Sequence, residues 1–80
     1  MRDDPTLQIL VEALRAYLIA RPQAADTVRG IADWWLVGIT PRPAVERITD
    51  ALEILAVEEL ADKVVLPDGT EIWRAVPQVD

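Results

Sequence analysis

A helical sequence pattern that leads directly into a β-hairpin pattern is the feature that most constrains this chain. From position 45, apolar side chains recur at the spacing of a helix with one buried face: Val45, Ile48, Leu52 and Leu55. Two β-rich segments follow, separated by Pro-Asp-Gly at positions 67–69, a composition typical of a tight turn. We therefore expect a helix followed by a two-stranded antiparallel hairpin over about residues 60–76.

A first helix is expected over about residues 5–20. Asp4 and Pro5 predict its start, because a carboxylate caps the first amides and proline suits the first turn. One apolar stripe follows at helical spacing: Leu7, Leu10, Val11, Leu14 and Leu18. Pro22 then predicts the end of the helix, because the residue before a proline disfavours helical backbone angles.

The second and third helices are expected over about residues 27–36 and 43–58. Asp26 or Thr27 is an acceptable N-terminal cap for the second helix. Gly30 inside it predicts close packing against a neighbouring helix, since an interior glycine otherwise costs about 1 kcal/mol relative to alanine.

These elements fit one domain over residues 1–80, of the α+β class, with a three-helix core and a C-terminal two-stranded wing. A lone two-stranded hairpin is marginally stable in water, so it must pack on the helices. We expect the apolar side chains of the hairpin to supply the covering face: Leu60, Val64, Leu66, Ile72 and Val76.

The composition excludes several kinds of chemistry. The chain has no cysteine and no histidine, and therefore no disulfide, thiolate metal site or Cys or His nucleophile. Glu58 and Glu59 point in different directions on a helix, so we expect no catalytic residue, no metal and no cofactor. No apolar stretch approaches the ~20 residues that span a bilayer, and acidic residues stand where a signal peptide is basic. We expect a cytoplasmic protein that is not an enzyme and has no membrane partner.

The order of elements resembles the winged helix-turn-helix superfamily over about residues 5–76. The similar segments are its second helix, turn, recognition helix and wing, at residues 27–35, 40–43, 45–60 and 66–70. The resemblance implies a recognition helix in the DNA major groove and a wing that touches the backbone or minor groove. It also implies that Arg42 and Arg47 contact base edges or phosphates, with Lys63 and Arg74 flanking the wing.

The charge of the chain argues against DNA as its partner. The net charge is −6, whereas a free-standing DNA binder carries a basic surface, because neutralising phosphates supplies much of its affinity. Residues 42–62 hold two arginines against six carboxylates: Glu46, Asp50, Glu53, Glu58, Glu59 and Asp62. Asp68 stands at the expected wing tip, where a DNA binder would place a basic residue. This balance favours a protein partner.

Two adjacent tryptophans offer another contact surface. Successive helical residues point about 100° apart, so Trp34 and Trp35 cannot both enter the same core. Spacing from Ile31 places Trp35 inward and leaves Trp34 at the edge or surface. Trp34 either covers the first helix or the hairpin, or it anchors an interface beside Leu36 and Val37.

A third tryptophan, Trp73, lies on the last expected strand. It either packs across the hairpin opposite Val64 or Val65, or it is a surface aromatic that favours dimerisation through the wing.

These observations predict a small acidic winged-helix protein that acts as a protein-interaction or dimerisation module, accessory to transcription. Its partner would be another protein or a second copy of itself. The interface candidates are Trp34, Leu36, Val37 and Trp73. The alternative is a DNA-binding transcriptional regulator that uses Arg42 and Arg47 of the third helix together with the wing.

Overall fold

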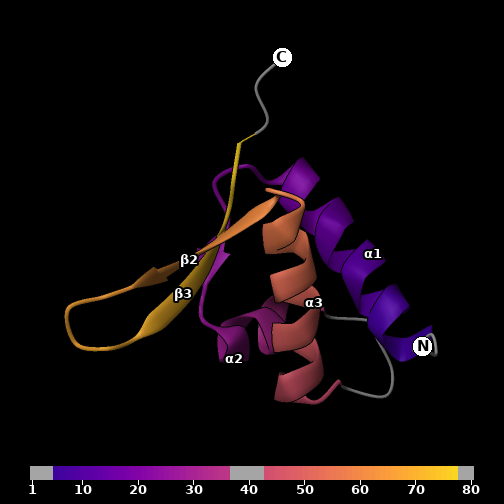
Figure 1. Cartoon of the computed structure of the whole chain (residues 1–80), viewed down its shortest axis with the longest axis horizontal. Helices are drawn as coiled ribbons and strands as arrows, with labels where there is room; N and C mark the ends of the chain where they lie inside the picture. The colour runs from indigo at the N-terminus through magenta and orange to yellow at the C-terminus, as the bar shows by residue number, and fades with distance from the viewer. Residues whose placement is uncertain (1–4, 37–42, 78–80) are drawn as a thin grey trace.

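The computed structural model describes residues 5–36 and 43–77 of the chain (Figure 1). Its elements, in chain order, are α1 (Pro5–Ala20), β1 (Ala25–Asp26), α2 (Val28–Gly30), the π-helix η1 (Ile31–Trp35), α3 (Val45–Val57), β2 (Ala61–Val65) and β3 (Glu71–Ala75). The helices form one layer and the sheet forms the other, with the β2–β3 hairpin projecting past the helices. The α+β class and the winged-helix-like order of elements agree with the sequence-based expectation.

The sheet contains three strands, in the order β1-β3-β2, instead of the expected two. Ala25 lies opposite Arg74 and Asp26 lies opposite Trp73, both in antiparallel register. The Ala75 N–H also donates to the Ala24 carbonyl at 2.8 Å. A two-residue strand is too short to produce an alternating sequence pattern, which is why β1 was not predicted.

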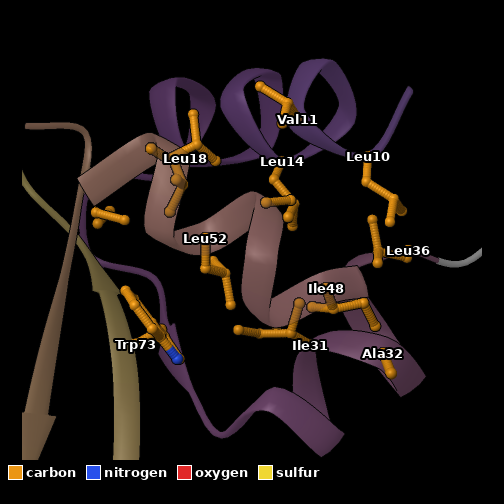
Figure 2. Close-up of a cluster of buried hydrophobic side chains, with 14 residues drawn as sticks. Leu10, Val11, Leu14, Leu18, Ile31, Ala32, Leu36, Ile48, Leu52 and Trp73 are labelled. Carbon is orange, nitrogen blue, oxygen red and sulfur yellow. The ribbon is translucent and has the colours of Figure 1, made fainter. Parts of the chain in front are cut away.

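The core lies between α1, α3 and the sheet (Figure 2). The expected apolar stripe of α1 is confirmed, with Leu7 partly buried and the other four members buried. The largest fully buried side chains come from α1, η1 and α3: Leu10, Leu14, Ile31, Ile48, Leu52 and Leu55. Trp73 closes this cluster from the sheet side.

The second helix begins as expected but changes its winding. Thr27 is the N-terminal cap, and its Oγ1 accepts a hydrogen bond from the Gly30 N–H at 3.1 Å. From Ile31 onward the helix widens into η1, whose i→i+5 hydrogen bonding differs from the expected α-helix.

The contact that constrains Gly30 differs from the expected helix packing. The three heavy atoms nearest to a Cβ built at Gly30 all belong to the Asp26 carboxylate, and such a Cβ would collide with them. The Asp26 Oδ1 accepts a hydrogen bond from the Thr27 N–H at 2.8 Å, so this carboxylate is held against the start of the helix. Gly30 therefore leaves room for a side chain that belongs to the helix cap.

The third helix starts two residues later than expected, at Val45, because Ala44 still has extended backbone angles. Val45 itself is exposed in the first turn and does not join the buried face. At the other end, Glu59 has the left-handed φ of 63°, and the Leu60 N–H returns to the Leu55 carbonyl at 2.9 Å. This is a helix C-terminus of the Schellman type, and β2 follows at once.

The strands of the hairpin present the opposite face from the one expected, although Leu60, just before β2, packs against the core as expected. Ala61, Trp73 and Ala75 are buried against the helices, whereas Val64 and Ile72 pair on the other side of the sheet. The cross-strand neighbour of Trp73 is Lys63, so the expected neighbours Val64 and Val65 are wrong. A one-residue difference reverses every side chain of a strand, and here the largest one, an indole, occupies the core side.

Candidate interaction surfaces

Trp34 is the large apolar side chain that the helical layer leaves exposed on η1. It is 72% exposed, although its neighbours Ile31 and Ala32 are buried. The expectation that Trp34 might cover the first helix or the hairpin is therefore wrong. The expectation that Trp35 turns inward is confirmed, because Trp35 is partly buried and packs against the core.

Two of the four interface candidates belong to the core. Leu36 is 4% exposed and Trp73 is 3% exposed, so neither reaches a partner in this conformation. Leu36 was placed beside Trp34 by sequence adjacency alone. Trp73 faces inward because the sheet register puts it on the helix side. Val37, like the cap candidate Asp4, lies outside the described residues, so the candidate surface rests on Trp34.

The outward face of α3 is acidic. Glu46, Asp50 and Glu53 are exposed, on the side away from the buried Ile48 and Leu52. Arg47, a candidate for base or phosphate contact, has its Nη1 3.6 Å from Asp50 Oδ2. Arg42 lies outside the described residues.

The two basic candidates near the wing also have carboxylate neighbours. Arg74 Nη2 donates to Asp62 Oδ2 at 3.1 Å across the hairpin. Lys63 Nζ lies 3.9 Å from Glu71 Oε1 and 5.8 Å from the centre of the Trp73 ring.

The wing tip carries a stabilised negative charge. The Thr70 N–H donates to Asp68 Oδ1 at 2.9 Å, and this hydrogen bond is the main reason that the pKa of Asp68 is lowered. The carboxylate at the tip of the hairpin is thus an element of the turn itself.

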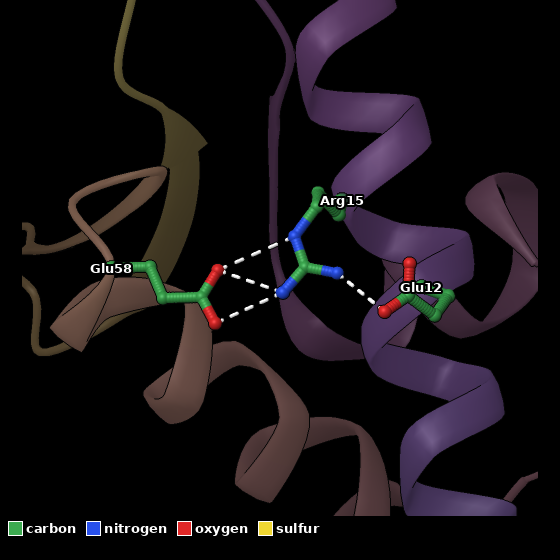
Figure 3. Close-up of polar contacts among 3 residues, drawn as sticks. All are labelled: Glu12, Arg15 and Glu58. Atoms are coloured by element: carbon green, nitrogen blue, oxygen red, sulfur yellow. Dashed lines mark hydrogen bonds and ion pairs between the residues drawn. The ribbon is translucent and has the colours of Figure 1, made fainter.

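An ion-pair network joins the first and third helices (Figure 3). Arg15 Nη2 lies 2.8 Å from Glu58 Oε1, and Arg15 Nη1 lies 2.6 Å from Glu12 Oε2. This ion pair of Glu58 was not predicted from the sequence. The partner lies 43 positions away, and no local pattern connects the two residues.

A stack of three side chains was also missed. The rings of Tyr17 and Trp35 stack with centroids 4.5 Å apart and an interplanar angle of 11°. The Arg21 guanidinium carbon lies 4.3 Å from the centre of the Tyr17 ring. The i,i+4 spacing of Tyr17 in α1 and Arg21 just after it was a signal for one half of this stack.

An open hollow of about 510 Å³ lies beside the stack. Its walls are the three stacked side chains and the segment that leads into β1: Pro22, Gln23, Ala24 and Ala25. The segment between α1 and β1 therefore borders a surface with both aromatic and cationic character.

Metal sites and membrane-spanning helices are both absent from the part of the chain that the structure describes. Within residues 5–36 and 43–77, no three acidic side chains are grouped so that they could hold a metal ion. Over the same residues, no helix has the length and apolar character needed to cross a membrane.

Comparison of the chain with protein-family models, with curated proteins and with solved structures finds no match. The class of the protein is therefore defined by its own architecture, a small α+β domain with winged-helix-like order. Function has to be argued from the surfaces described above.

Proposed function

We propose that the chain is a protein-interaction module that associates with a second copy of itself or with another protein through the surface around Trp34. The observation that supports the proposal most directly is the 72% exposure of this side chain. Tryptophan is enriched at the energetic centres of protein interfaces, because it buries a large area with few rotatable bonds.

Charge supports a protein partner over a nucleic acid. The chain has a net charge of −6. Among the described DNA-contact candidates, Arg47, Lys63 and Arg74 each lie within 4 Å of a carboxylate. Such exposed pairs are weak, but binding DNA would bring phosphates close to the same carboxylates.

A homodimer is the simplest form of the proposal. A two-fold axis near η1 would bring Trp34 of each copy onto the same surface of the other, which makes the contact self-complementary. A role accessory to transcription and a cytoplasmic location belong to the proposal as well. The first rests on the winged-helix-like order, and the second on the absence of cysteine.

The test is sedimentation equilibrium of the whole chain over a range of concentrations. We expect the wild type to self-associate and Trp34→Ala to shift the equilibrium strongly toward monomer. Val57→Ala is the matched control, because Val57 is 85% exposed on α3, and its truncation should leave the association unchanged. Equal association of the wild type and Trp34→Ala would contradict the Trp34 surface, and a monomeric wild type would contradict the homodimer form.

DNA binding, the alternative implied by the resemblance, is tested by fluorescence anisotropy with a random duplex at low salt. Electrostatic affinity is greatest there, so any general affinity for duplex DNA would be visible. We expect no saturable binding. Saturable binding that Arg47→Ala weakens would overturn the preference for a protein partner.

A further inference from the structure

The outer edge of β1 is open to pairing. The Ala24 carbonyl accepts from Ala75 of β3, and Asp26 lies opposite Trp73 of the same strand. Main-chain groups of successive strand residues point to alternate sides, so the N–H and C=O of Ala25 point away from β3. Ala25 is exposed. Ala25 therefore presents a donor and an acceptor that no strand within residues 5–36 and 43–77 pairs with.

The hollow beside the aromatic stack borders this open edge. Ala24 and Ala25 line it together with Tyr17 and Trp35, and no residue of β3 contributes. The hollow is therefore next to the edge where a fourth strand would pair. Its volume of about 510 Å³ holds several residues of an extended chain.

The charge at the hollow is positive, in contrast to the chain as a whole. Six basic side chains fall within the described residues, and four of them lie within 4 Å of a carboxylate: Arg15, Arg47, Lys63 and Arg74. Arg21 and Arg29 make no such pair within that part of the chain. Arg21 lines the hollow and stacks on Tyr17, which leaves the in-plane N–H groups of its guanidinium directed outward.

We infer that the β1 edge binds an extended, acidic peptide segment of a partner protein as an added strand. The peptide main chain bonds to the N–H and C=O of Ala25, one apolar side chain packs against Tyr17 and Trp35, and a carboxylate pairs with Arg21. Strand addition uses main-chain bonds for affinity and side-chain contacts for selectivity. The inference goes beyond the Trp34 surface, because it uses none of the residues on which that proposal depends.

The opposite edge of the sheet provides a matched control. Val65 lies opposite Glu71, and the N–H of the next residue, Leu66, donates to Thr70. Because main-chain groups alternate in direction along a strand, the N–H of Val65 points away from β3. The aromatic hollow beside β1 is lined by no residue of β2. Ala25→Pro and Val65→Pro therefore each remove an outward donor and spare the hydrogen bonds within the sheet.

The experiment titrates the whole chain with a labelled hexapeptide that alternates valine and glutamate, followed by anisotropy and by NMR. We expect saturable binding with shifts at the Ala25 amide and the Trp35 indole. Ala25→Pro should weaken binding about tenfold, and Val65→Pro should leave it unchanged. Arg21→Gln should weaken the glutamate peptide but not its glutamine counterpart, and Trp34→Ala should have no effect.

Three results would overturn the inference: no saturable binding, equal effects of the two proline variants, or equal binding of a peptide that is N-methylated at every residue. The N-methylated peptide removes main-chain donors without changing the protein, so it decides the question even if a proline variant unfolds. Binding of an oligothymidylate of matched charge that depends on Arg21 but not on Ala25→Pro would assign the hollow to single-stranded nucleic acid instead. Failure here leaves the Trp34 proposal intact, because its readout is self-association.

Discussion

Arg15 and Glu58 form a three-contact ion pair in which Nη2 donates at 2.8 and 2.9 Å and Nε donates at 3.3 Å. The pair ties the middle of α1 to the C-terminal end of α3. Hydrogen bonding to Glu58, and then to Glu12, raises the pKa of the Arg15 guanidinium. Because a carboxylate at a helix C-terminus opposes the helix dipole, Arg15 offsets an unfavourable charge at that position.

Removal of this pair should have a small effect that depends on salt. Both groups are partly exposed, and exposed ion pairs contribute little net stability. We expect Arg15→Gln and Glu58→Gln each to lower the melting temperature slightly, with the double variant no worse than the more damaging single variant. The coupling should shrink when the melts are repeated at ~1 M salt. Additive effects would mean that the two residues act independently.

Two isoleucines of α3 allow the effect of burial on stability to be measured apart from the effect of helix propensity. Ile48 is fully buried and Ile54 is 37% exposed, so the same substitution can be compared on one helix. We expect Ile48→Val to lower the free energy of unfolding by about 0.5–1.5 kcal/mol. Ile54→Val should cost less than ~0.5 kcal/mol. Urea denaturation measures both, and equal losses would contradict the packing described for α3.

Gly30→Ala should fail to stabilise the helix in the wild type, because the added Cβ displaces the Asp26 carboxylate from its hydrogen bond to Thr27. In the Asp26→Ala background the collision is absent, and the same substitution should stabilise the protein by about 1 kcal/mol through helix propensity. A double-mutant cycle by urea denaturation measures the difference. Equal effects of Gly30→Ala in the two backgrounds would show that Asp26 does not occupy this space.

The wing tip should titrate at low pH. The Thr70 N–H holds the folded pKa of Asp68 below its ordinary value. The contribution of Asp68 to stability is therefore present above the unfolded pKa and is lost as the pH falls through the folded pKa. A carboxyl-carbon NMR titration should show a midpoint below the ordinary aspartate value. Thr70→Val keeps the N–H but removes the hydroxyl, so it should raise that midpoint only part of the way.

The parts of the fold that were predicted from the sequence depend on local patterns. The extent of α1 followed from Pro5 and Pro22, and its buried face followed from the leucine spacing. The inward position of Trp35 followed from its distance to Ile31. Local patterns did not determine which face of the hairpin packs on the helices, because both faces carry large apolar side chains. Val64 and Ile72 lie on one face, and Trp73 lies on the other. Only the volume available beside the helices decides between them, and that volume is a property of the assembled core.

Among the candidate surfaces, too, only those that depend on a local sequence pattern were predicted. Trp34 was identified because helical geometry allows only one of two adjacent tryptophans to enter the core. The stack of Tyr17 and Trp35, the β1 edge and the Arg15–Glu58 pair each join segments that are distant in the sequence. A short strand such as β1 also owes its existence to β3, which comes nearly 50 residues later.

The left-handed residue Glu59 has a mechanical consequence. The chain turns from α3 into β2 across Glu58, Glu59 and Leu60 alone, so only a short segment joins the hairpin to the helix. We therefore expect a load at the tip of the hairpin to move α3 together with the sheet. A pair of fluorophores at the tip and on α3 should keep a constant separation under such a load.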